Sequence, residues 1–508
     1  MAGFLTNIER RVIPRWRRFN DALKLKELAF IAPALPRETT PIADFLAQKI
    51  VDWRKHQTIG HATDFVGAAI ALGKSQEAIT AAKFLVKQNR NVSPWAIELA
   101  EYVLESPYKV AQTPSNPVAV EQSVLRAQVR SLRRALNIES RDPITWVELS
   151  RVYAILGHVK KAKHSMTVAL QLAKNNRFVL RSASRLWVHA GDPEKAHEII
   201  IRADRTRHDP WLLAAEIALG SIDGKRPKLV KAGRRMLSEG KFPHGHISEL
   251  ASALATLELQ CGSVKKSKKL FALSLKNANE NSFAQAAWVS SRPHSEIRLE
   301  YQYLTVPSAF EAEYRVCCQK GEWNRAVEQC KLWQFDQPFS SEPSVHGSFV
   351  AGVALEDYES SKNFAEHGLI ANQADFTLWN NLAFACINLE DFKKAEHAIS
   401  KADCLPLSDR DRAVLHATRG LLKFRTESVE SGRQLYLDAR LAAQRIKNTR
   451  LLTLATVFHA IEEITQEEFD SESVLSEAFH YLKRESDPIF RVLETKLKKM
   501  NTKLPKRP

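Results

Sequence analysis

Several features that mark common classes of protein are missing from this sequence of 508 residues. No uninterrupted apolar run approaches the ~18 residues of a membrane-spanning helix, so no transmembrane segment is expected. The N-terminal stretch MAGFLTNIERRVIPRWRRF lacks the apolar core and the cleavage site of a secretory signal. The six cysteines include no CxxC pair, so we expect reduced side chains in a cytoplasmic protein.

The motifs of catalysis and of cofactor binding are missing as well. There is no G-x-S-x-G elbow, no HExxH motif and no dinucleotide-binding fingerprint. The stretch that ends in Gly73, Lys74 and Ser75 approaches a phosphate-binding loop, but Ala68 stands where that loop needs its first glycine. The cysteine spacings do not match a zinc site. The sequence therefore predicts a non-enzymatic protein without a cofactor, a metal ion or a small-molecule substrate.

What the sequence does contain is an internal period of 34 residues. In one region, three small residues recur 34 positions later: Gly157, Ala162 and Ala169 return as Gly191, Ala196 and Ala203. In a second region, four positions recur with the same spacing: Val345, Tyr358, Ser361 and Gly368 correspond to Trp379, Phe392, Ala395 and Ala402. A fixed period in this range is typical of stacked helical hairpins.

The apolar spacing within residues 143–176 predicts two helices. The first has one apolar face at i, i+3, i+4 and i+7, ends at Gly157, and is followed by a second with small inner residues: Trp146, Leu149, Ser150 and Tyr153, then Ala162, Met166 and Ala169. This pattern resembles the tetratricopeptide repeat, W-x2-L-G-x2-Y then A-x3-F then A, with Ser150 in place of glycine and Met166 in place of an aromatic residue. The resemblance implies an all-α fold: a right-handed superhelical array of antiparallel helix hairpins, a TPR-like α-solenoid.

The other copies and the proline positions divide the chain into segments. The units at 177–210, from 310 and from 376 keep the pattern, the unit at 342–375 is degenerate, and prolines at 107, 114 and 117 end any helix there. We expect a basic amphipathic N-terminal helical segment (1–37), N-terminal helical hairpins (38–106), a Pro-rich linker (107–120), a basic TPR-like array (121–280), an irregular joint (281–308), a second TPR-like array (309–445), C-terminal helices (446–500) and a basic tail (501–508).

The net charge of +16 is concentrated in one part of the chain. Residues 121–279 hold 29 Lys and Arg against 14 Asp and Glu, whereas residues 280–508 have a net charge of −4. Such an asymmetry suggests an acidic partner, either a protein segment or a nucleic acid, or else a solvated face that aids solubility.

In the tetratricopeptide family, the first helix of each hairpin lines a concave groove, and its positions 2, 5, 9, 12 and 13 face inward. Carried over by phase, the resemblance places three arginines and an asparagine pair on or beside these positions: Arg151, Arg181, Arg185, Asn380 and Asn381. Arginine can bind carboxylates with two parallel hydrogen bonds. The favoured hypothesis is a scaffold or adaptor that grips an acidic segment of a protein partner in this groove, and the alternative is that these residues are merely solvated.

Two other functions remain open at this point. A second basic set is expected on turns and second helices, where it could attract the phosphates of a nucleic acid: Lys160, Lys161, Arg202, Arg234, Arg235, Lys265 and Lys266. The basic helix expected within residues 4–28 could instead attach an assembly factor to an anionic membrane surface, or cap the end of the array.

Overall fold

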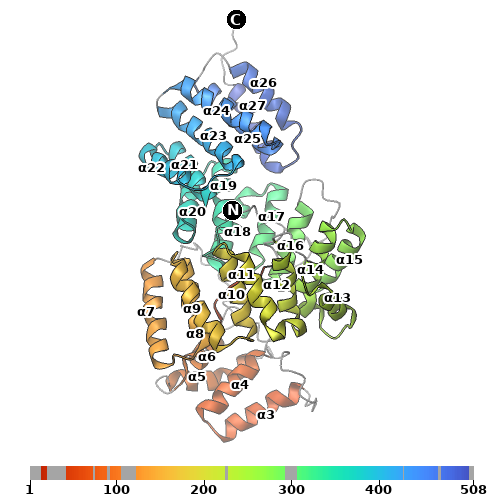
Figure 1. Cartoon of the computed structure of the whole chain (residues 1–508). Coiled ribbons are helices and arrows are strands. Elements are labelled where there is room, and N and C mark those ends of the chain that lie inside the picture. Colours follow the sequence, from red (N-terminus) through yellow and green to blue (C-terminus); the bar gives the residue numbers. More distant parts are fainter. Residues whose placement is uncertain are drawn as a thin grey trace. The chain divides into compact units, whose positions relative to one another are not determined.

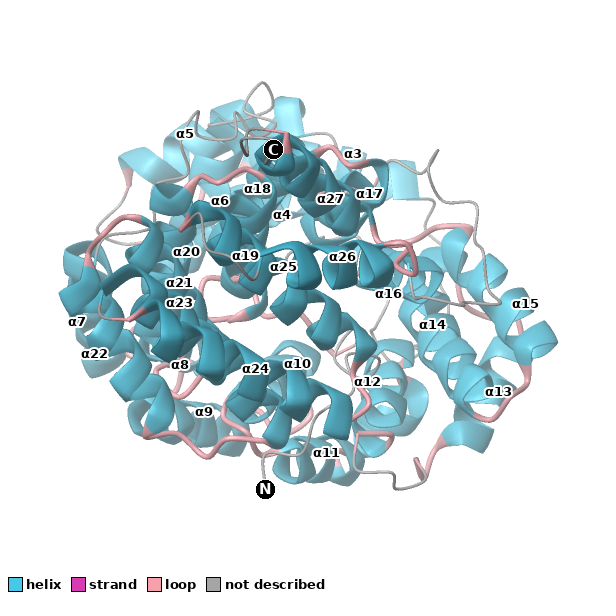
Figure 2. Cartoon of the chain, turned by 90° about the horizontal axis from the view of Figure 1, so that it is seen from above, coloured by secondary structure: helices cyan, strands magenta, loops and turns pink. Residues whose placement is uncertain are grey.

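The computed structural model of the chain contains helices and no strands in the part that it describes (Figure 2). The described residues are 13–19, 42–71, 75–88, 92–104, 122–222, 227–291, 306–426, 428–466 and 471–502. The expected linker at 107–120, the Gly73–Lys74 pair and most of the N-terminal segment and of the tail lie outside these residues. None of the helices described is long and apolar enough to span a membrane.

The chain forms two compact units, and the smaller one comprises Trp16–Val118. Its helices are α3 (Ile42–Lys55), α4 (Ile59–Ala71), η1 (Ser75–Ala78), α5 (Ile79–Lys87) and α6 (Pro94–Leu104). Phe65, Val66 and Leu85 are buried in its core, and Trp53 packs edge-on against Phe84 with ring centroids 5.0 Å apart. The hairpins expected at 38–106 therefore have a core of their own.

The larger unit, formed by residues 1–15 and 119–508, holds the remaining helices (Figure 1). Its first part contains α7 (Gln122–Ile138), α8 (Pro143–Ile155), α9 (Val159–Leu172), α10 (Arg177–His189), α11 (Pro193–Arg202), η3 (Asp204–His208), α12 (Pro210–Gly220), α13 (Val230–Ser238), α14 (His244–Gln260), α15 (Val264–Leu275) and α16 (Glu280–Ser291). The second part contains α17 (Phe310–Lys320), α18 (Trp323–Asp336), α19 (Glu342–Ala354), α20 (Tyr358–Ala371), α21 (Phe376–Asn388), α22 (Phe392–Asp403), α23 (Asp409–Thr426), α24 (Val429–Arg445), α25 (Thr449–Thr465), α26 (Ser471–Leu482) and α27 (Pro488–Asn501).

Consecutive helices of the larger unit pack as hairpins with the predicted period. The first helices of four successive hairpins begin at residues 143, 177, 210 and 244, which are 34, 33 and 34 residues apart. All residues of α12 are buried, as are most of α14, whereas α13 and α15 bury few. We call the first helix of each hairpin the inner helix and the second the outer helix. The predicted all-α solenoid of antiparallel hairpins is thereby confirmed.

The turn between inner and outer helix requires a left-handed backbone. Gly157, Gly191 and Gly321 adopt φ of 73°, 76° and 74° there, a conformation that glycine tolerates without a steric penalty. In the next two hairpins Glu356 and Glu390 take this place, with φ of 55° and 61°. The degenerate unit at 342–375 thus forms a complete hairpin, α19 and α20, although its sequence lacks the turn glycine.

Hairpin packing explains two deviations from the repeat pattern. The hydroxyl of Ser150, which replaces the usual glycine, donates a hydrogen bond of 2.8 Å to the carbonyl of Ala162 on the outer helix. Ser361 and Ser267 make the same inner–outer link, each at 2.8 Å. A serine at this contact satisfies its own hydroxyl and holds the two helices together.

Two segments differ from the simple expectation. An irregular joint was expected over 281–308, but its first part continues the regular helix α16 to Ser291, and residues 292–305 lie outside the described part. In the N-terminal segment, where a helix was expected, residues 13–18 are not helical. Pro14 lies within this stretch, and proline disfavours a helix at the residue before it.

Candidate functional site

Inner helix α10 presents three arginines on one face, at positions 177, 181 and 185. Arg177 donates from Nε to Asp209 Oδ2 at 2.7 Å, and its guanidinium lies 4.0 Å from the centre of the Trp211 ring. Burial lowers the pKa of Arg177 to about 10, although Asp209 opposes this shift. The cation thus joins α10 to the start of α12, the next inner helix.

Arg181 makes the strongest contact of this arginine row. Its two Nη atoms donate to the two carboxylate oxygens of Glu249 at 2.9 and 3.0 Å, and the two side chains are 15% and 3% exposed. Glu249 also accepts from Asn279 Nδ2 at 2.9 Å. A bidentate arginine–carboxylate pair with this little exposure fixes α10 to α14 in one geometry.

The other two predicted arginines also lie inside the array. Arg185 Nη2 is 3.4 Å from Ser340 Oγ, and its guanidinium lies 5.5 Å from the centre of the Phe339 ring. Arg151 is buried, with 8% of its surface exposed. The predicted arginine groove is therefore an inner surface in which Arg181 and Arg185 already have partners from the same chain. Binding of a partner protein by these arginines remains a prediction.

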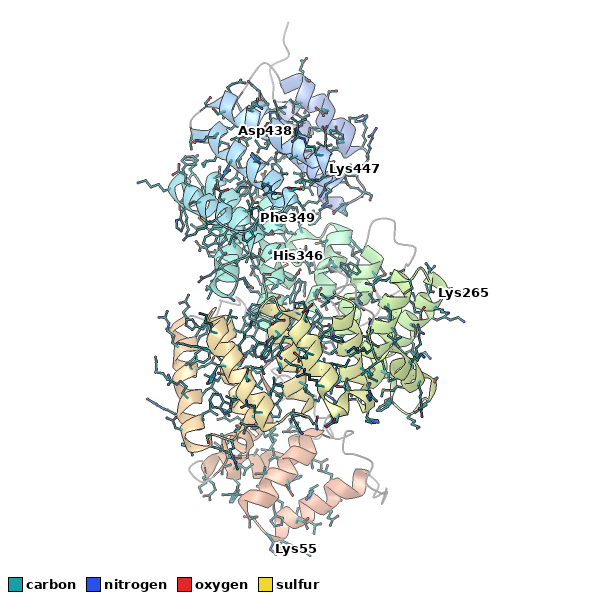
Figure 3. The ribbon with its side chains drawn as sticks, viewed as in Figure 1. Lys55, Lys265, His346, Phe349, Asp438 and Lys447 are labelled. Atoms are coloured by element: carbon teal, nitrogen blue, oxygen red, sulfur yellow. The ribbon has the colours of Figure 1, made fainter. Side chains whose placement is uncertain are left out.

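A second inner surface has the form of a pocket with a volume of about 230 Å³. We call it the phenylalanine pocket, since the half-buried rings of Phe349, Phe384 and Phe458 line it, together with side chains from inner helices α19, α21, α23 and α25. The Phe384 and Phe458 rings meet edge to face with centroids 5.5 Å apart. Figure 3 labels Phe349 on α19. Apolar rings that remain half exposed in a concave site are typical of a binding surface.

Both predicted asparagines line the phenylalanine pocket. Asn381 donates from Nδ2 to Ser348 Oγ at 2.8 Å, and Asn380 accepts from the Thr418 hydroxyl at 2.8 Å. Exposed cations stand at the pocket edge, where Arg410 begins α23 and Arg450 begins α25. The site therefore combines apolar rings, oriented amides and positive charge.

The predicted outer basic residues are exposed, but they do not form one continuous basic set. Lys160 and Lys161 lie on α9, and the Lys161 ammonium lies 5.7 Å from the centre of the Tyr153 ring. Arg202 on α11 is paired with Glu198 at 2.5 Å. Because α11 carries both Glu194 and Glu198, it interrupts the positive surface between α9 and α13.

The densest basic surface lies on outer helices α13 and α15, neither of which contains an aspartate or glutamate. Arg234 pairs with Glu258 and Arg235 with Glu239, at 2.5 and 2.7 Å. The four lysines of α15 are all exposed: Lys265, Lys266, Lys268 and Lys269. Figure 3 shows Lys265 extending away from α15. We call this set of four the α15 lysines.

Sequence reasoning selected the asparagines of the phenylalanine pocket but not its phenylalanines. Phe384 stands at position 9 of its repeat, the same inward position that selected Arg151 and Arg185. The signal was therefore available, but an apolar residue at an inward position was assigned to the hairpin core. Among the residues that the structure describes, no three His, Cys, Asp or Glu side chains are grouped to hold a metal ion.

Comparison with known proteins gives a likeness at the level of solved structures alone. No family model matches the chain, and no curated protein matches it. Similar structures include a human IFIT1 dimer with PPP-AAAA (15% identity, 87% of this chain and 93% of that chain, TM-score 0.33). The APC/C hetero-tetramer Cut9–Hcn1 (12% identity, 90% and 95%, 0.33) and yeast Tom70 (12% identity, 91% and 96%, 0.31) are also similar. At these values the TPR-like assignment rests on the hairpins and the period of the chain itself.

Proposed function

We propose that this chain is a scaffold that acts by binding a protein partner, and that the phenylalanine pocket is its partner site. The observation that carries the proposal is the group of half-buried phenylalanine rings open to a 230 Å³ pocket between inner helices. A pocket of this size holds a single large apolar side chain rather than a metabolite. It would act as the anchor point of a segment, and no group placed in it supplies chemistry.

The polar groups around the pocket define the rest of the segment. Asn380 and Asn381 can offer hydrogen bonds to its backbone, as the sequence predicted. Arg410 and Arg450 can attract acidic residues on either side of the anchor. The partner that fits is therefore an apolar or aromatic anchor flanked by acidic residues. Arg151, Arg181 and Arg185 are not required in this proposal, because their contacts hold helices together.

A photo-crosslinking amino acid placed at position 384 should capture this partner. The matched control is position 335, because Phe335 on outer helix α18 is 53% exposed and far from the pocket in sequence. The protein captured at 384 but not at 335 should then be purified and its affinity measured. Phe384→Ala should weaken its binding by about 10–100-fold, the usual effect of removing an aromatic anchor.

The same measurement can contradict the proposal. Phe335→Ala should leave the affinity unchanged, and the helical content of both variants should match the parent protein. Equal loss of binding in both variants, or equal crosslinking from both positions, would remove the pocket from consideration as the partner site.

A second function is favoured by one specific observation, the basic surface of α13 and α15. Helices without any acidic residue and with exposed lysines offer a non-specific site for the phosphates of double-stranded nucleic acid. No aromatic residue interrupts the α15 lysines, so stacking of single-stranded bases is not part of this proposal.

Charge reversal of the four α15 lysines to glutamate tests this second function. Duplex binding should weaken at least tenfold, and its dependence on salt should become shallower, because fewer counterions are released. The control is reversal of four exposed lysines on α22 and α27, which gives the same change in net charge: Lys393, Lys401, Lys498 and Lys499. Fluorescence anisotropy with a labelled duplex measures both. Equal loss in the two variants would show that only the total charge matters.

The third hypothesis, attachment to a membrane surface through an N-terminal helix, gains no support from residues 13–19. Ile13 is 2% exposed and Arg15 is paired with Glu311, so neither is available to a lipid surface in this conformation. The rest of that segment lies outside the described residues.

A further inference from the structure

Three N-terminal residues lie against inner helices α16 and α17, far along the chain. The carbonyl oxygen of Ile13 accepts a hydrogen bond of 3.2 Å from Asn281 Nδ2 on α16. Ile13 and Asn281 are each 2% exposed, and Pro14 is buried beside them. The backbone of 13–15 is not helical, and Pro14 favours an extended conformation there.

A buried ion pair holds the next residue. Arg15 Nη2 lies 2.9 Å from Glu311 Oε2, and the two side chains are 10% and 7% exposed. Arg315, one turn later on α17, lies 3.8 Å from the other oxygen of Glu311. The segment is thus read through its backbone by an asparagine and through its side chain by a carboxylate. These are the two kinds of contact by which a groove recognises an extended peptide.

The segment also forms part of the wall of a cavity of about 540 Å³. The opposite wall comes from the end of α10 and from the loops before α19 and α21, with Arg185, Asn372 and Asp375 among the lining residues. A cavity of this size has room for more polypeptide than the three residues beside it. It is separate from the phenylalanine pocket, with which it shares no lining residue.

We propose that Asn281 and Glu311 form a binding site for an extended segment of the type apolar–proline–arginine, which residues 13–15 occupy as an exchangeable ligand of the same chain. A partner protein with a basic segment of this type would displace them. Glu311 selects a positive charge, so this site takes a ligand of opposite charge to that proposed for the phenylalanine pocket. Tethering gives the chain's own segment an effective concentration in the millimolar range, so the parent protein should bind an added peptide weakly.

The test uses the full chain and two labelled peptides, residues 9–19 and the same peptide with Arg15→Glu. In the protein variant Arg15→Glu, the tethered segment is repelled by Glu311, and the site should become available. The native peptide should bind this variant at least tenfold more tightly than it binds the parent protein. In the variant Glu311→Arg the preference should reverse, so that only the peptide carrying glutamate binds.

Two controls keep the result specific. Glu328→Arg on α18, whose side chain is 57% exposed, gives the same charge change as Glu311→Arg and should bind the peptides as the parent protein does. A scrambled peptide of the native composition should bind none of the variants. If both peptides fail to bind a folded Arg15→Glu variant, the segment is a fixed structural strap and the proposal is overturned.

A second measurement remains decisive if Arg15→Glu does not fold. Hydrogen exchange of the parent protein reports whether the backbone amides of residues 15–19 open locally. An exchangeable ligand requires that these amides exchange at least tenfold faster than the amides of α16 and α17. Exchange at the same rate as those helices would overturn the proposal, because the segment would then leave only when the unit unfolds.

Discussion

Replacing Arg181 with glutamate should destabilise the larger unit by about 3–5 kcal/mol, the cost of removing one partner from a buried ion pair. The variant places two carboxylates where Arg181 and Glu249 now share two hydrogen bonds of 2.9 and 3.0 Å. Sequence reasoning predicts a small cost, on the expectation that Arg181 is a groove residue facing solvent. At 15% exposure and in bidentate contact with Glu249, the side chain no longer supports that expectation.

The double variant Arg181→Glu with Glu249→Arg should recover part of the loss, since it restores a pair of opposite charges at the same place. Arg202→Glu is the matched control, because Arg202 on α11 is 76% exposed and pairs only one turn away with Glu198. That change should alter the free energy of unfolding by less than about 1 kcal/mol. Urea titrations followed by circular dichroism measure all three. Equal effects at positions 181 and 202 would contradict the structural role of Arg181.

Acidification should weaken the C-terminal hairpins through His459. This side chain is 1% exposed on α25, and burial lowers its pKa from the ordinary 6.5 to about 4, with Arg440 acting in the same direction and Glu463 against it. Its titratable or charged neighbours come from four helices: Tyr436, Arg433 and Arg440 on α24, Glu462 and Glu463 on α25, Arg425 on α23 and Glu477 on α26. The buried imidazole is held neutral in the folded chain.

The sign of the pH effect follows from the lowered pKa. Between pH 6.5 and pH 4 the unfolded chain binds a proton at this histidine and the folded chain does not, so stability falls as the pH falls. A shift of this size corresponds to about 3 kcal/mol. The loss is complete near pH 4, below which both states are protonated.

The variant His459→Gln isolates this contribution from other groups. Buried His246 and His367 have lowered pKa values and act in the same direction, so the parent protein and the variant must be compared over the same pH series. The difference in unfolding free energy between them should change by about 3 kcal/mol from pH 7 to pH 4. A difference that stays constant with pH would show that His459 is not the group responsible.

Local chemistry explains why the hairpins could be predicted. The period of 34 residues, the turn glycines such as Gly157 and the small contact residues such as Ala162 each act within one hairpin. Glu356 and Glu390 show the limit of this reasoning, because the hairpin forms even where the turn residue carries a side chain. Neighbouring hairpins then supply the packing that the local sequence lacks.

Contacts between distant repeats explain what could not be predicted. The inward position of Arg181 follows from the phase of its repeat, but Glu249 is 68 residues further on and has no sequence relation to it. The same holds for Arg15 and Glu311, which are 296 residues apart. A repeat pattern describes each hairpin and its neighbours, and it contains no information on such pairs.

The Arg15–Glu311 pair has a consequence for the newly made protein. During synthesis the ribosome adds about 5–20 residues per second, so Glu311 follows Arg15 after roughly 15–60 s. For that period the segment around Ile13 has neither its carboxylate nor Asn281, while the early hairpins are already long enough to fold. The nascent chain therefore carries an apolar and basic N-terminal segment without its binding site, and this interval is the time in which a chaperone or a second copy of the chain can capture it.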